Sequence, residues 1–142
     1  MTTADEPAWQ IAWRDGLSVG NARIDSDHKE LIQRVNDLNA SLVAQAGQDE
    51  VLRRMQRLLE TATVHFASEE RLLHDRGFPQ LEKHRRKHET LTADFQRAMD
   101  NFAKAVPGLA WLAKGLVISQ ALMEHLAKDD MIYRDFLRSD GD

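Results

Sequence analysis

The apolar residues of this chain recur every three or four residues over four long stretches, which is the period of one face of an α-helix. Only three prolines and seven glycines interrupt the 142 residues, so a few long helices are favoured over many short strands. The four apolar stripes are Leu31, Ile32, Val35, Leu38 and Leu42; Val51, Leu52, Met55, Leu58, Leu59, Ala62, Phe66, Leu72 and Leu73; Leu81, Leu91, Phe95, Met99 and Phe102; and Leu112, Leu116, Leu122, Leu126, Tyr133 and Leu137.

Turn chemistry separates these stretches. The first helix is predicted to begin at Asp25–Ser26–Asp27, where small oxygen-bearing side chains can accept backbone N–H groups. Gly47–Gln48–Asp49 follows this helix, 75–79 (with Gly77 and Pro79) ends the second, and Pro107–Gly108 follows the third. The pattern predicts an all-α fold, an up-down-up-down antiparallel four-helix bundle over about residues 25–138.

Residues 1–24 are predicted to form an irregular N-terminal arm, because Gly16 and Gly20 break any helical period. The arm is too apolar to remain in water, so we expect it to lie across the bundle. Its apolar residues are Trp9, Ile11, Trp13, Leu17, Val19 and Ile24. The length of the chain is that of one ordinary domain, and residues 1–142 are expected to form a single one.

Composition excludes several classes of function. The chain has no cysteine, which excludes disulfides, zinc–thiolate sites, cysteine-ligated iron–sulfur clusters and cysteine nucleophiles. Its formal charge of −4 disfavours a nucleic-acid partner. The sequence contains neither an apolar run of transmembrane length nor the layout of a signal peptide in residues 1–7. We therefore expect a cytoplasmic protein with no membrane partner.

Five of the six histidines and one glutamate interrupt the apolar stripes, at positions that face the predicted interior. They are His28, His65, Glu69, His84, His88 and His125. One such histidine could simply be a core residue with a hydrogen-bonded ring. Five buried imidazoles all need partners, however, and a metal ion supplies partners for all of them at once. The sixth, His74, lies beside a loop and is expected to be solvated.

The spacing of these residues favours a shared metal site. Two pairs are four residues apart, which places both members on one helix face: His65 with Glu69, and His84 with His88. The ligands outnumber the four that a tetrahedral zinc takes, which suggests two metal ions. The last helix also offers Asp129 and Asp130; a regular helix prefers Asp129, a local bulge would bring Asp130 inward, and spacing alone does not decide.

The pattern H, H-x-x-x-E, H-x-x-x-H, H-x-x-x-x-D resembles the full ligand set of the hemerythrin family. It is carried by His28, His65, Glu69, His84, His88, His125 and Asp130. Four stretches resemble bacterial members: Trp13 to Gly20 in the arm, 24–29, 65–70 and Phe78–Pro79. The resemblance covers about residues 11–138. It selects Asp130 over Asp129.

The resemblance implies a non-haem di-iron centre that binds O2 reversibly. Glu69 and Asp130 would bridge the two irons together with an oxo or hydroxo group. The two irons would have different numbers of histidine ligands. His84, His88 and His125 would bind one iron, and His28 and His65 would bind the other. The second iron would then have an open position for O2, lined by Leu31, Phe66, Leu122 and Leu126.

Two residues depart from the pattern of many relatives. Ala121 stands where many carry tryptophan, which predicts a wider pocket or an access channel. Asp27 stands where many bacterial relatives carry glutamine, and it is expected either to cap the first helix or to tune His28.

The resemblance implies an O2-binding protein for storage, delivery or sensing, not an enzyme apart from slow oxidase or peroxidase side activity. NO or azide-like small anions are further candidate ligands, and a monomer is expected. The alternative is a di-iron oxidase, a peroxidase or a nitric-oxide-handling protein. No Glu-x-x-His sequence occurs, which argues against a ferritin-like oxidase. A histidine phosphotransfer bundle would leave four of the inward histidines unexplained.

Overall fold

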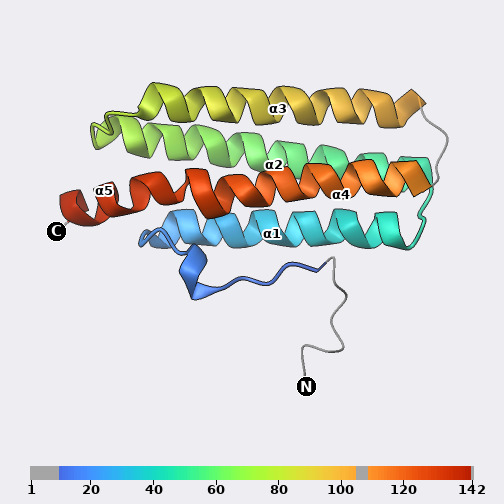
Figure 1. Ribbon diagram of the computed structural model, residues 1–142, viewed down its shortest axis with the longest axis horizontal. Helices are drawn as coiled ribbons and strands as arrows, with labels where there is room; N and C mark the ends of the chain where they lie inside the picture. The colour runs from blue at the N-terminus through green and yellow to red at the C-terminus, as the bar shows by residue number, and fades with distance from the viewer. Residues whose placement is uncertain (1–9, 105–108, 142) are drawn as a thin grey trace, which may run out of the picture.

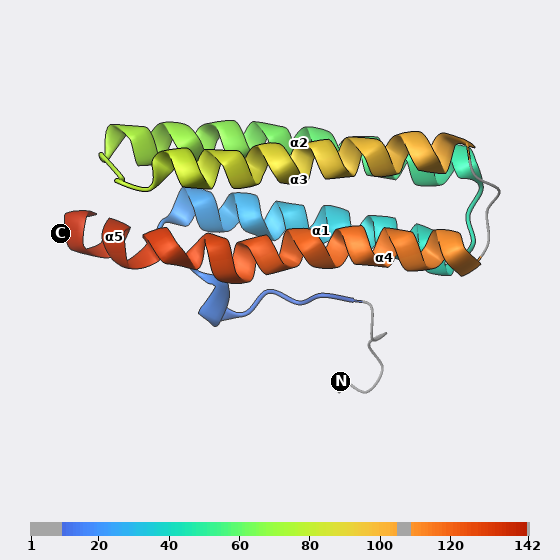
Figure 2. The same ribbon diagram turned by 45° about the horizontal axis from the view of Figure 1, so that its top comes forward.

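Four helical rods run antiparallel to one another in the computed structural model, which describes residues 10–104 and 109–141 (Figures 1 and 2). The rods are α1 (Ala22–Val43), α2 (Gln48–Asp75), α3 (Leu81–Lys104) and, as the fourth, α4 (Leu109–Glu124) followed by α5 (Met131–Gly141). Each rod packs against the next along the chain, and α4 closes the ring against α1. The predicted up-down-up-down bundle is therefore confirmed. None of the described helices is both long enough and apolar enough to span a membrane.

The fourth rod is not one regular helix. A π-helical turn over His125–Asp129 separates α4 from α5, and in it the backbone N–H of Asp130 donates to the carbonyl of His125 at 3.0 Å. The apolar stripe of this rod continues through the turn, which explains why the stripe did not reveal the interruption. Trp9, expected in the apolar arm, and Pro107–Gly108, expected after the third helix, lie outside the described residues.

The predicted start of the first helix is wrong by three residues. The helix begins at Ala22, because the side chain of Asn21 accepts the backbone N–H groups of Arg23 and Ile24 at 3.1 and 3.0 Å. Asp25 lies inside the first turn and holds the arm instead. Its carboxylate accepts hydrogen bonds from the Ser18 hydroxyl at 2.5 Å and the Val19 backbone N–H at 2.9 Å.

The arm lies across the bundle, as predicted, over its described residues. Asn36 on α1 accepts the backbone N–H of Ile11 at 2.8 Å and donates to the carbonyl of Ile11 at 2.7 Å. Ile11 and Trp13 also pack against the hydrophobic core, and the ammonium group of Lys29 lies 5.1 Å from the centre of the Trp13 ring. The arm therefore covers apolar surface that α1 would otherwise expose.

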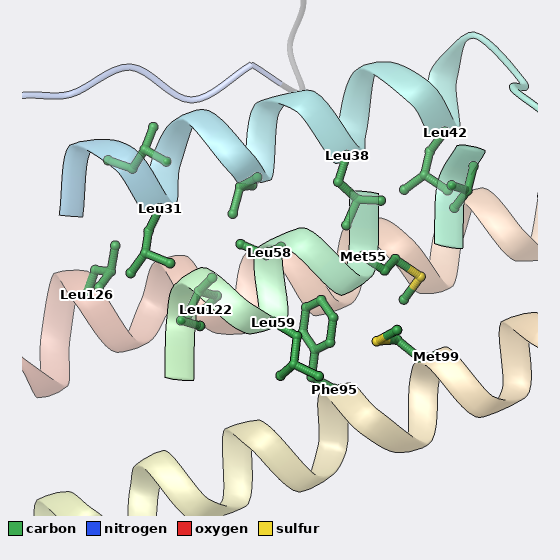
Figure 3. Close-up of a cluster of buried hydrophobic side chains, with 14 of the residues drawn as sticks. Leu31, Leu38, Leu42, Met55, Leu58, Leu59, Phe95, Met99, Leu122 and Leu126 are labelled. Carbon is green, nitrogen blue, oxygen red and sulfur yellow. The ribbon is translucent and has the colours of Figure 1, made fainter. Parts of the chain in front are cut away.

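Two apolar clusters of unequal size fill the bundle. The larger lies toward the α1–α2 end of the bundle (Figure 3) and includes Leu31, Leu38, Met55, Leu58, Phe95, Met99, Leu122 and Leu126. The smaller lies near the α2–α3 loop and consists of Val19, Ile24, Leu73, Phe78, Tyr133 and Leu137. Full burial of one such side chain stabilises the fold by about 1.5–3 kcal/mol. The inward histidines occupy the layer of the bundle between the two clusters.

Two helices end in the same hydrogen-bonded motif with different residues in the left-handed position. At the end of α2 this residue is Gly77 (φ 72°), and Phe78 N–H donates to Leu73 O at 2.9 Å. At the end of α1 it is Gln45 (φ 55°), and Ala46 N–H donates to Ser41 O at 2.9 Å. The left-handed conformation is unfavourable for a residue with a Cβ, so the end of α1 is strained.

We expect Gln45→Gly to stabilise the protein by about 1 kcal/mol, because glycine adopts the left-handed conformation without a Cβ clash. The matched substitution Gly77→Ala should destabilise it by about 1 kcal/mol. A Cβ at position 77 would meet no atom within 4 Å, so that loss reports backbone conformation alone. Urea unfolding of both variants measures the two effects. Equal stabilities of Gln45→Gly and the parent would contradict the assignment.

Candidate metal centre

Seven buried side chains converge in the layer between the two apolar clusters. In one group, Glu69, His84, His88, His125 and Asp130 each offer a nitrogen or oxygen atom within 4.8 Å of the others. A second group joins His28 and His65 to the same two carboxylates. Each of the seven residues is at most 4% exposed. The structure therefore brings together all of the residues that the sequence proposed as ligands.

Antiparallel packing explains this convergence. His28 lies in the second turn of α1, His65 and Glu69 in the second half of α2, and His84 and His88 in the first two turns of α3. The start of α1, the end of α2, the start of α3 and the end of the fourth rod share one end of the bundle (Figure 1). The apolar period turns each of these faces inward, and the polar side chains follow it.

The π-helical turn decides which aspartate enters the centre. Its extra residue rotates Asp130 to the inward face, where the side chain is fully buried and Oδ1 lies 3.1 Å from Nε2 of His125. Asp129 instead faces outward, with 29% of its side chain exposed and Oδ2 3.0 Å from Nδ1 of the same histidine. The preference of a regular helix for Asp129 is wrong here because the helix is not regular.

Several atoms at the centre face one another without forming hydrogen bonds, although Nε2 of His84 is hydrogen-bonded to Oε1 of Glu69 at 2.7 Å. Among the described residues, both ring nitrogens of His28, Nε2 of His65 and both oxygens of Asp130 are buried without a hydrogen-bond partner. His28 Nε2 lies only 3.1 Å from Asp130 Oδ2, yet the angles do not suit a hydrogen bond. Nε2 of His88, in contrast, forms a hydrogen bond with Nε2 of His125 at 3.1 Å.

Leaving a buried polar atom unpaired costs about 1–3 kcal/mol, and more for a charged one. One or two cations here would pair Nε2 of His28, Nε2 of His65 and both oxygens of Asp130 at once, because these atoms face a common space. Nδ1 of His28 lies on the opposite edge of its ring and is not among them. Imidazole nitrogens and carboxylate oxygens, without sulfur, suit iron and other first-row metals. The donor set therefore fits a metal centre.

Outer carboxylates hold the far sides of three imidazoles. Nδ1 of His88 lies 2.7 Å from Glu70, Nδ1 of His125 lies 3.0 Å from Asp129, and Nδ1 of His65 lies 3.4 Å from Asp27. Such partners fix the ring orientation and the tautomer of metal-binding histidines. Cations anchor two of these carboxylates, since Arg85 donates to Glu70 at 3.2 Å and Lys87 donates to Asp129 at 2.8 Å.

Asp27 therefore has neither of its expected roles. It lies inside α1, whose cap is Asn21, and its carboxylate contacts His65 on the neighbouring helix and not His28. Glu70 was missed in the sequence because it lies off the apolar stripe. Its position directly after Glu69, about 100° around the helix from the inward face, was the available signal.

Tyr133 is a further buried polar contact that the sequence pattern assigned to the core. Its hydroxyl donates to Oε2 of Glu69 at 2.8 Å. Burial and the nearby charges of Asp130 and Glu69 raise the pKa of Tyr133 well above its ordinary value, so the phenol stays a neutral donor. This hydrogen bond fixes one oxygen of Glu69, a carboxylate that belongs to both donor groups.

The two central carboxylates draw protons to the histidines when no metal is bound. Burial alone would lower the pKa of His28, but the close oxygens and charges of Asp130 and Glu69 outweigh it and raise the pKa to about 9. The same balance raises the pKa of His84 to about 9. Burial would raise the pKa of Glu69, yet the surrounding histidines hold that pKa well below the ordinary range.

The four apolar side chains expected beside the open position are all buried, at 0% exposure for Leu31, 5% for Phe66 and Leu122, and 2% for Leu126. The Phe66 ring stacks on His88 with a centroid separation of 3.9 Å and an interplanar angle of 8°. Ala121 lines a cavity together with Phe66 and Leu122.

His74 stays outside the centre, with 73% of its side chain exposed.

Metal binding should compete with protons at this centre. At pH 7 His28 and His84 are protonated in the metal-free protein, so Zn(II) must displace about two protons per chain. We expect Zn(II) affinity to rise from pH 7 to 9 and to level off above the pKa of about 9. The metal-free fold should show the opposite trend, because protonation of His28 and His84 stabilises it. Its free energy of unfolding should therefore fall as the pH rises from 6.5 to 9.

Calorimetric Zn(II) titrations in buffers of different ionisation enthalpy measure the protons released, and urea unfolding across the same pH range measures stability. An affinity that does not change between pH 7 and 9 would contradict the proton competition.

Comparison with known proteins gives a consistent result. The sequence profile of the family described as "Hemerythrin HHE cation binding domain" matches residues 19–137. A bacteriohemerythrin from Pseudomonas aeruginosa (strain PAO1) is 29% identical over 130 residues, which cover 90% of this chain and 82% of the relative. A bacteriohemerythrin from Stenotrophomonas maltophilia is 26% identical over 133 residues, covering 91% of this chain and 82% of the relative.

The fold agrees as well. A crystal structure of a hemerythrin point mutant superposes with a TM-score of 0.78 at 20% identity, covering 88% of this chain and 95% of that one. The profile match spans most of the chain and includes all seven residues of the buried centre. The chain therefore belongs to the hemerythrin family.

Proposed function

We propose that the protein holds two iron ions in the buried centre and binds O2 there reversibly, for storage, delivery or sensing. The observation that carries this proposal is the pair of overlapping donor groups, which share Glu69 and Asp130 and contain buried atoms without hydrogen-bond partners. When bound, the iron pair supplies the redox chemistry that reversible O2 binding requires. The same centre would also accept NO or azide-like small anions.

The two donor groups would hold the ions unequally. His84, His88 and His125 would bind one ion, and His28 and His65 would bind the other. Glu69 and Asp130 would be ligands of both. The ion on the side of His28 and His65 has fewer protein ligands, so it is the one with room for an external ligand. Leu31 and Phe66 adjoin these two histidines along α1 and α2 and provide apolar surroundings.

The remaining contacts support a carrier role. The neutral Tyr133 hydroxyl holds Glu69, and the outer carboxylates hold three of the imidazoles in place. Tyr133 and the outer carboxylates hold the metal-binding side chains in position within the protein itself, so no second substrate is needed to assemble the site. An apolar and enclosed site also excludes water, which favours reversible binding over irreversible oxidation.

The test is an iron count followed by an O2 titration. The purified protein should contain two irons per chain and, after anaerobic reduction, develop a visible absorption band on exposure to O2 that disappears under argon. Irreversible oxidation with turnover of a reductant would instead indicate a di-iron oxidase or peroxidase. Less than one metal per chain would contradict the proposal altogether.

Two single variants test the unequal assignment within the same experiment. His65→Ala should abolish the O2-dependent band more completely than His88→Ala, because it removes a ligand from the ion that already has fewer. Both histidines are buried and contact Glu69, so the variants are matched in burial and in their carboxylate partner. Equal loss in the two variants would count against the assignment.

A further inference from the structure

An apolar cavity lies beside the buried centre, between α2, α3 and α4. Its volume is about 170 Å³, and it is partly open to solvent. Phe66 and Leu122 line it on the inner side, whereas Val117 and Ala121 lie at its outer side. Val117 is 66% exposed, and Ala121 is also exposed. The cavity therefore runs from the surface to the side chains that adjoin the histidines.

The small side chain of Ala121 explains why the cavity is open. Leu122 turns into the core and Val117 lies one turn earlier on the outer side of α4. A methyl group at position 121 leaves the space between α3 and α4 unfilled at this level, next to Leu91 and Phe95. An unfilled apolar space of this kind forfeits packing contacts that an occupant would restore.

The polar groups of the lining already have partners. The Thr92 hydroxyl donates to the carbonyl of His88 at 2.8 Å, and the Asp94 carboxylate pairs with Arg97. The rest of the lining is apolar. A charged or polar ligand would lose its hydration here without gaining hydrogen bonds. An apolar cavity of about 150 Å³ is sufficient to bind benzene, so the volume of this one suits a single small ring.

The inner wall of the cavity is one ring thick. The Phe66 ring stacks on His88 at 3.9 Å and lies 5.6 Å from the ring of His125 at an interplanar angle of 74°. Nε2 atoms of both histidines belong to the buried centre. An occupant that contacts Phe66 is therefore separated from two of the proposed ligands by that ring alone.

We propose that this cavity is a binding site for a small, uncharged, apolar molecule of about the size of benzene. Binding itself depends only on the shape and lining of the cavity. The nearness of the occupant to a metal ion rests, in addition, on the proposed function.

Fluorobenzene is a suitable probe, because its ¹⁹F NMR signal reports binding to the full-length protein directly. We expect saturable binding at one site. Ala121→Trp should weaken it by at least about tenfold, because the indole occupies the space that the ligand needs. Ala93→Trp introduces the same ring at an exposed position on α3 outside the cavity and should leave the affinity unchanged.

Ala121→Leu fills less of the cavity than Ala121→Trp does. It replaces Ala121→Trp in the test if that variant does not fold, as judged by loss of the helical circular dichroism signal. Absence of saturable binding to the parent protein would overturn the proposal. Equal affinity in the parent and in folded variants at position 121 would overturn it as well.

A second arm locates the bound probe. The ¹⁹F signal of bound fluorobenzene should be broadened in Co(II)-loaded protein but not in Zn(II)-loaded protein, because Co(II) is paramagnetic. Broadening would support the position beside Phe66. Normal Co(II) uptake and fluorobenzene binding without broadening would overturn that position. Failure to take up Co(II) would instead count against the proposed metal centre and leave the binding result intact.

Discussion

Seven nitrogen- and oxygen-bearing side chains are buried at one level of this bundle, with their lone pairs directed at a common space. An apolar interior does not tolerate such groups unless each has a partner. The helices themselves do not provide one, since His28, His65 and Asp130 keep buried atoms without a hydrogen bond. The need for a partner, which cations would meet, is the constraint around which the rest of the structure is arranged.

The surroundings of these groups serve the same constraint. Outer carboxylates hold His65, His88 and His125 from behind, and Tyr133 holds Glu69. The apolar clusters on either side keep this layer dry. Without a metal, protons on the histidines balance the two central carboxylates, which is why the pKa values of His28 and His84 are raised to about 9. Protons and metal ions therefore compete for one set of atoms.

The helical period of the sequence predicted the bundle and the inward direction of the histidines, because both follow from which residues share a helix face. It did not predict the start of α1, where Asn21 and Asp25 are both capable caps and contacts with the arm decide between them. It did not decide between Asp129 and Asp130 either. That choice depends on a π-helical turn, which leaves the apolar stripe unbroken. Glu70 was harder still, because its role depends on what the neighbouring helix places opposite it. The cavity at Ala121 was expected from the family resemblance and not from the helical period.

The central claim is that the buried donors form a centre for two metal ions, and anomalous X-ray diffraction at the iron edge from crystals of the iron-loaded protein tests it most directly. The account predicts two iron peaks inside the bundle, with Glu69 and Asp130 contacting both. His84, His88 and His125 should contact one peak, and His28 and His65 the other. A single peak, a peak elsewhere on the protein, or Asp129 in the place of Asp130 would contradict it.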